Sequence, residues 1–268
     1  GLRVCNLRRE STEQQKSAIA RVCEFKIRKK KAQNSKKSAA ARVCESAKGK
    51  GYSWKGAERM NVLAVGSHFN NIELGCGGAL LRHVQKGDKV VLFVAATSGP
   101  LNSERNETGR DEIVFQNAQE AAQIIGGRLI CGGFETLHLE FEDTLNAKLV
   151  HLIEREKFDL IYTHFPGDPQ HDHRALARAA IHAGRHIPAI LGYRCSWYQS
   201  EEPFRPNFFV DISDVWDKKE AAIRKYQSNS GRVKEEKIAY FKNDAQNNGR
   251  QNGVSFAEGF QVIKWLER

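Results

Sequence analysis

From residue 60 onwards, short apolar runs alternate with segments in which apolar residues recur at helical spacing. Asn61–Gly66 and Lys89–Ala96 are predominantly apolar runs of the length typical of buried strands. Between them, Glu73–Lys86 has the spacing of an amphipathic helix, and Gly87 is the residue type that commonly follows a helix C-terminus. The same criteria predict strands at Arg128–Cys131, Asp159–His164, Leu191–Trp197 and Phe208–Ile212, and helices at Asp111–Ile125, Thr144–Lys157, Asp172–Gly184, Ser213–Gln227, Arg232–Lys242 and Ser255–Phe260.

This alternation of strands and helices predicts an α/β fold: a Rossmann-like open, mostly parallel sheet with helices on both faces. In such sheets the ligand crevice lies beyond the carboxyl ends of the strands. Two segments therefore become candidates for the functional site, SHFNN after the first strand and THFPGDPQHDH at the end of the DLIY strand. The polar stretch Thr97–Arg110 is predicted to be a loop, either a solvated connection or a lid over a ligand.

Positive charge is concentrated at the start of the chain. Residues 1–59 contain 17 of the 42 Lys and Arg residues and 5 of the 32 Asp and Glu residues, so residues 60–268 are close to neutral. Large apolar residues are few in this basic segment, and such a composition favours a disordered or appended region. Met60, the single methionine, favours a folded domain over 60–268. Nucleic-acid binding through the basic segment and a role in targeting are the competing hypotheses.

The six cysteines are split between the basic segment and the domain and form no CxxC pair, so we expect a reducing, cytoplasmic setting. No run of 18 apolar residues is present, and no membrane association is expected. A nicotinamide cofactor is also disfavoured, because LGCGGALL has the wrong glycine spacing and the strand Lys89–Ala96 does not end in an acidic residue that would hold a ribose.

Histidines at the predicted crevice indicate a metal site. His68 ends one strand, and His171 and His173 lie at the start of a helix that follows another strand. Each histidine alone is more often structural. Together they favour a divalent metal ion with imidazole ligands and an open coordination position.

Three blocks of the sequence then resemble one family. GSHFNNIELGCGGALL, THFPGDPQHDHRALA and FVDISDVWDKKEAAIRKYQSN look like the LmbE / PIG-L family of zinc-dependent N-acetylglucosaminyl deacetylases, over about residues 60–260. The family motifs are H-P-D-D-x-E with L-G-x-G-G, and H-x-D-H-R. Carried over residue by residue, this resemblance assigns the metal positions to His68, Asn71 and His173. It assigns the general base to Asn70 and the group that stabilises the transition state to Gln170.

The chain departs from the family pattern at the most reactive positions. Asn70 and Asn71 replace two aspartates, and a carboxamide cannot act as a general base at neutral pH. The loss of a general base should lower the rate by about 10²–10⁴. Asn71 offers only a neutral oxygen to a metal. A shifted proton transfer through His171 or Asp172 is the alternative route. Glu73 is expected to interact with the helix dipole or to support the site indirectly.

The sequence therefore predicts a zinc-dependent hydrolase, with another divalent metal as a variant, that removes the acetyl group from an N-acetylated amino sugar or sugar conjugate with reduced activity. The alternative is an inactive member of the family that binds a sugar or acts as a scaffold. Nucleic acid is not an expected partner outside residues 1–59. The identity of the sugar, that of the acyl group and the formation of homo-oligomers stay open.

Overall fold

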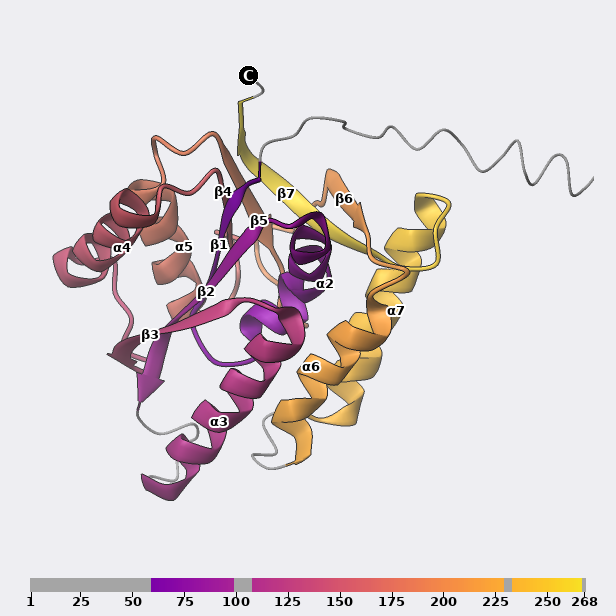
Figure 1. Cartoon of the computed structure of the whole chain (residues 1–268), viewed down its shortest axis with the longest axis horizontal. Helices are drawn as coiled ribbons and strands as arrows, with labels where there is room; N and C mark the ends of the chain where they lie inside the picture. Colours follow the sequence, from indigo (N-terminus) through magenta and orange to yellow (C-terminus); the bar gives the residue numbers. More distant parts are fainter. Residues whose placement is uncertain (1–58, 99–107, 229–232, 267–268) are drawn as a thin grey trace, which may run out of the picture. The chain divides into compact units, whose positions relative to one another are not determined.

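The computed structural model of the chain describes residues 59–98, 108–228 and 233–266 (Figure 1). Residues 1–58 of the predicted basic segment and residues 99–107 of the predicted loop Thr97–Arg110 lie outside the described residues, so the expectations for them stay predictions. The two ends of that loop differ from the prediction, because Thr97 and Ser98 belong to a strand and residues 108–110 to a helix.

Within the described residues, seven strands form one sheet in the order β3-β2-β1-β4-β5-β7-β6. The five strands from β3 to β5 pair in parallel, and β7 pairs antiparallel with β5 and β6. The predicted mostly parallel α/β sheet is thus confirmed. The strands are β1 (Asn61–Gly66), β2 (Lys89–Ser98), β3 (Arg128–Glu135), β4 (Leu160–His164), β5 (Ala189–Tyr193), β6 (Phe208–Asp211) and β7 (Ala257–Trp265).

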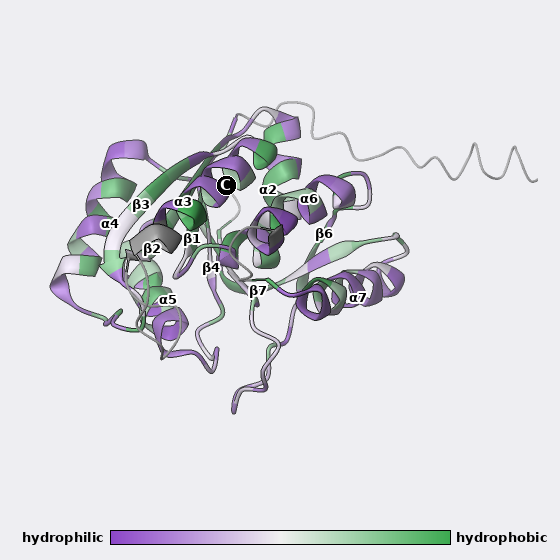
Figure 2. Cartoon of the chain, turned by 90° about the horizontal axis from the view of Figure 1, so that it is seen from below, coloured by the Kyte–Doolittle hydropathy of each residue, from purple (hydrophilic) through white to green (hydrophobic). Residues whose placement is uncertain are grey.

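Helices cover the sheet on both sides. Figure 1 shows α4 and α5 on one face and the other four helices on the opposite face. The side chains of β1 alternate between the two cores accordingly: Val62 and Ala64 belong to one apolar cluster, and Leu63 and Val65 to the other. The outer sides of α4 and α7 are largely hydrophilic (Figure 2). The helices are α2 (Asn71–Lys86), α3 (Thr108–Ile125), α4 (Asp143–Glu156), α5 (His171–Ala183), α6 (Trp216–Ser228) and α7 (Glu235–Gln251).

One predicted element is wrong. Ser255–Phe260 was expected to be helical, but Ala257–Trp265 is strand β7. At Gly259 a Cβ atom would come within 2.9 Å of the Pro206 side chain, in the segment before β6, so this position in the strand has no room for a side chain. The β-branched residues that follow in VIKW also favour a strand.

The first helix packs closely on the sheet because of its glycines. A Cβ atom at Gly75 would lie 2.1 Å from the Tyr193 ring. This agrees with the expectation that the LGCGG segment serves packing.

The order of the strands determines where a ligand site can form. The chain runs from β1 outward to β2 and β3, and then returns to place β4 on the other side of β1. The crevice beyond the carboxyl ends of β1 and β4 is therefore the topological switch point of the sheet. None of the described helices is both long and apolar enough to cross a bilayer.

Candidate active site

His68 follows the carboxyl end of β1 and is oriented by a buried carboxylate. Its Nε2 lies 2.6 Å from Oδ2 of Asp172, in the first turn of α5. Asp172 also accepts hydrogen bonds from the backbone N–H groups of Leu137 and Leu139. Burial alone would raise the pKa of Asp172, but the contact with His68 and these two backbone bonds outweigh it and lower the pKa. Asp172 is therefore a carboxylate at neutral pH.

His173 has an equivalent partner. Its Nδ1 lies 3.0 Å from Oδ1 of Asp168, which is buried in the loop after β4. Burial would lower the pKa of His173, but the adjacent Cys195 sulfur and the Asp168 carboxylate outweigh it and raise the pKa to about 10. Without a metal ion, this imidazole carries a proton at neutral pH.

The imidazole rings of His68 and His173 lie close together. The ring centroids of His68 and His173 are 5.5 Å apart, and the ring planes are tilted by 46°. Two imidazoles that share a tetrahedral zinc ion at about 2.0–2.1 Å bring their centroids to roughly 5 Å. Metal-ligating histidines also typically donate their other ring nitrogen to a carboxylate, as the contacts to Asp172 and Asp168 would allow.

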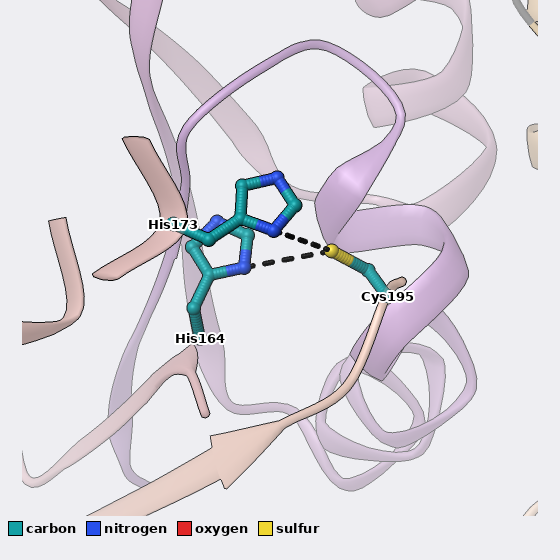
Figure 3. A group of neighbouring side chains, drawn as sticks. All are labelled: His164, His173 and Cys195. Carbon is teal, nitrogen blue, oxygen red and sulfur yellow. Dashed lines mark hydrogen bonds between the residues drawn. The ribbon is translucent and has the colours of Figure 1, made fainter. Parts of the chain in front are cut away.

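His164, His173 and Cys195 form a second group (Figure 3). Their ligand-type atoms lie within 4.8 Å of one another, so the group could hold a metal ion. The His164 and His173 rings, however, are stacked with centroids 4.1 Å apart and only 7° between their planes. The lone pair of an imidazole nitrogen lies in the ring plane, so stacked parallel rings cannot both point at one ion.

The hydrogen bonds of His164 support the same conclusion. Its Nε2 accepts from the backbone N–H of Ser67 at 2.9 Å, so the ring proton of the neutral form is on Nδ1 and points toward the Cys195 sulfur at 3.5 Å. Burial, followed by the charges of His173 and His68, lowers the pKa of His164 well below its ordinary value. Both nitrogens of this neutral ring are engaged, which makes His68 and His173 the better metal pair.

The paired asparagines lie at the start of α2, next to His68. Asn71 Oδ1 accepts from the backbone N–H of His68 at 2.8 Å, and Asn71 Nδ2 donates to Asn70 Oδ1 at 3.4 Å. Asn70 has a left-handed backbone with a φ of 82°. The donor set around a metal ion here would thus be two imidazoles and one neutral carboxamide oxygen that already accepts a hydrogen bond. The two histidines fit zinc, and the third position fits it weakly.

Comparison with known proteins identifies the family. The family model for PIG-L, the GlcNAc-PI de-N-acetylase, matches residues 63–184. The chain is 31% identical over 189 residues to the uncharacterized deacetylase YaiS of Escherichia coli, covering 64% of this chain and 92% of that protein. The chain belongs to the PIG-L family.

Other proteins similar to this chain differ in the reaction that their names describe. Diacetylchitobiose deacetylase of Thermococcus kodakarensis is 24% identical over 221 residues, which is 75% of this chain and 82% of that protein. The structure of the 4-carboxy-2-hydroxymuconate hydratase from Pseudomonas putida superimposes with a TM-score of 0.66, at 22% identity, over 78% of this chain and 98% of that chain. This likeness shows the shared fold, and function must be argued from the site.

The other candidate residues, Gln170, His171 and Glu73, differ in their contacts and in their exposure to solvent. Gln170 caps α5, since its Oε1 accepts from the backbone N–H of His173 at 2.8 Å. The side chain of His171 is exposed on the outer side of α5. Glu73 is buried and accepts from the Tyr226 hydroxyl at 3.0 Å, and burial raises its pKa to about 7. The roles expected for Gln170 and His171 stay predictions.

Three residues of the site did not emerge from the sequence. His164 ends β4 as His68 follows β1, so its position at a strand end was a usable signal. Asp168 lies in the loop already singled out, but its contact with His173 depends on how that loop folds back. Cys195 follows β5 and had no signal, because only the packing of β5 beside β4 brings its sulfur to the histidines.

Proposed function

We propose that the chain is a metal-dependent de-N-acetylase that removes the acetyl group from an N-acetylated amino sugar or sugar conjugate. One observation carries this proposal. At the switch point of the sheet, His68 and His173 lie 5.5 Å apart, and each contacts its own buried carboxylate. The deacetylases among the relatives support the same reaction.

The imidazoles of His68 and His173 would hold the metal, with Asn71 as a weak third donor. When bound, a zinc ion, or another divalent metal, supplies a Lewis acid for the acetyl carbonyl and lowers the pKa of water to roughly 7. Asp172 and Asp168 fix the orientation of the two rings and make them more basic ligands.

Proton transfer is the step at which this chain differs from the family motif. Asn70 cannot accept a proton, so the rate should fall by about 10²–10⁴ relative to a site with a carboxylate there. Both oxygens of Asp172 already accept hydrogen bonds, which makes it a poor substitute. His171 is the remaining candidate, because its exposed ring lies at the start of α5, one residue before Asp172.

The proposal is tested by metal analysis and acetate release on the full-length chain. Purified protein should contain about one zinc per chain and release acetate from diacetylchitobiose or N-acetylglucosamine. A His68→Ala variant should lose both properties, whereas His151→Ala, a change of the same kind at an exposed position on α4, should lose neither. Acetate release that is equal in all three proteins would refute the assignment.

The paired asparagines favour a second candidate, a family member that binds an acetamido sugar without cleaving it. Asn70 and Asn71 offer hydrogen bonds but neither a base nor a charged ligand. Calorimetric binding of N-acetylglucosamine to a metal-free protein that releases no acetate would support this candidate over the hydrolase.

A further inference from the structure

A separate hollow lies along the outer side of α5. It has a volume of about 540 Å³. His171, Arg174 and Arg178, which follow one another at helical spacing on the same helix face, form one wall, and Glu140 and Phe141 line it from the segment before α4. Nothing in the proposed acetyl hydrolysis uses these side chains except His171.

Contacts within this hollow, the α5 pocket, hold its two arginines in place. Arg174 donates from its guanidinium to the backbone carbonyls of Asp168 and Pro169 at 2.9 and 2.6 Å. The guanidinium of Arg178 lies over the Phe141 ring, 5.0 Å from its centroid. Arginines fixed in this way lose less side-chain entropy when they bind an anion than freely rotating ones.

The α5 pocket adjoins the candidate metal centre through the chain itself. Its lining residue Glu140 directly follows Leu139, whose N–H donates to the carboxylate that contacts His68. Its residue His171 directly precedes that carboxylate, Asp172. Two lining residues of the pocket are thus direct chain neighbours of groups that hold the candidate metal centre together.

The charges in the pocket favour an anion. Two guanidinium groups face one carboxylate, that of Glu140, and the positive end of the α5 dipole lies beside His171. We propose that the α5 pocket binds an anionic group, a phosphate or a carboxylate, that is carried by the substrate. This inference rests on the proposed function and narrows its substrate class to acidic acetamido-sugar conjugates. Arginine recognises both kinds of anion through the same paired N–H donors.

Three probes with a common sugar test the proposal on the full-length chain: N-acetylglucosamine, its 6-phosphate, and N-acetylmuramic acid, which carries a carboxylate. Binding is measured by calorimetry and acetate release by a coupled assay. An acidic probe should bind about fivefold to tenfold more tightly than the neutral sugar. Arg178→Gln should abolish this preference, and Glu140→Gln should increase it. Arg185→Gln, the matched control beyond the end of α5, should leave it unchanged.

Each outcome separates the anion pocket from the deacetylase activity. A preference for the phosphate or for the carboxylate probe identifies which anion the pocket selects. An acidic preference that depends on Arg178, in a protein that releases no acetate, supports the pocket and refutes the proposed function. Acetate release without any acidic preference, or with a preference that Arg178→Gln does not change, overturns the pocket and leaves the proposed function standing.

Discussion

The Asn70→Asp variant places a carboxylate at the N-cap of α2, next to the hydrogen bond that the backbone N–H of His68 donates to the Asn71 side chain. The side chains of Asn and Asp have the same shape, and both tolerate the left-handed backbone that Asn70 adopts. A negative charge at a helix N-terminus stabilises the helix by about 0.3–1 kcal/mol. With zinc bound to offset the buried charge of the new carboxylate, the variant should therefore fold as well as the natural chain, and a change in rate then reports on the chemistry.

The expected gain in rate follows from what the carboxylate adds. The Asn71 Nδ2 donor is 3.4 Å from the Asn70 side-chain oxygen, so an aspartate would keep a hydrogen-bond donor that favours its ionised form. A positioned general base contributes about 10²–10⁴ in rate, which corresponds to about 3–5 kcal/mol of activation free energy. We expect kcat to rise by this factor at saturating zinc.

The assay is acetate release from diacetylchitobiose by the natural chain and by Asn70→Asp, with zinc content measured in the same samples. Asn252→Asp, at the exposed end of α7, adds the same charge far from the carboxyl ends of β1 and β4 and should have no effect. If Asn70→Asp binds zinc as the natural chain does and shows no gain, then Asn70 is not at the position where the base acts, and the catalytic assignment is wrong.

Three further outcomes follow from the contacts described. Asp172→Asn should weaken zinc binding about 10–100-fold in a competition titration, because His68 loses its charged partner, and an unchanged affinity would contradict that role. Zinc affinity should increase with pH between pH 6 and 8, because the raised pKa of His173 means that its imidazole keeps a proton that zinc must displace. A flat profile would show that His173 is not a ligand. Burial raises the pKa of Glu73 from 4.5 to about 7, so between these pH values the folded state retains a proton that the unfolded state has lost. The free energy of unfolding should therefore fall by up to about 3 kcal/mol as pH rises from 4.5 to about 7. Glu73→Gln should remove this dependence in urea titrations, and a slope that persists would assign it to other groups.

The sequence predicted the local elements best where a local signal determines them. The strand Asn61–Gly66 has the predicted bounds, and α2 ends at Gly87, whose φ of 87° requires the left-handed region. The start of α2 was placed two residues late, at Glu73. Asn is a favoured N-cap residue, but Asn70 has a left-handed backbone and makes no side-chain capping bond, so it is not a typical cap. Helix starts without a capping signal are hard to locate from residues alone.

Long-range pairing was predicted less well. Strand β7 was missed because its role depends on β5 and β6, which lie on either side of it in the sheet and far from it in the sequence. At the candidate site, the motifs selected His68 and His173, whose ring centroids lie 5.5 Å apart, and their role as ligands stays a prediction. The supporting carboxylate of Asp168 and the thiol of Cys195 depend on loop paths that no periodicity encodes.

The balance of charge at the centre gives the paired asparagines a physical meaning. Without a metal ion, protonated His173 offsets the charge of Asp168, and the neutral carboxamides at positions 70 and 71 add no further charge to the cluster. Aspartates at positions 70 and 71 would add two negative charges in a buried place, and only a divalent cation would offset them. Zinc should therefore raise the melting temperature of the natural chain less than that of the Asn70→Asp, Asn71→Asp double variant, which should require zinc for full stability. Equal zinc dependence in both proteins would mean that the carboxamides do not determine how strongly this centre depends on its metal.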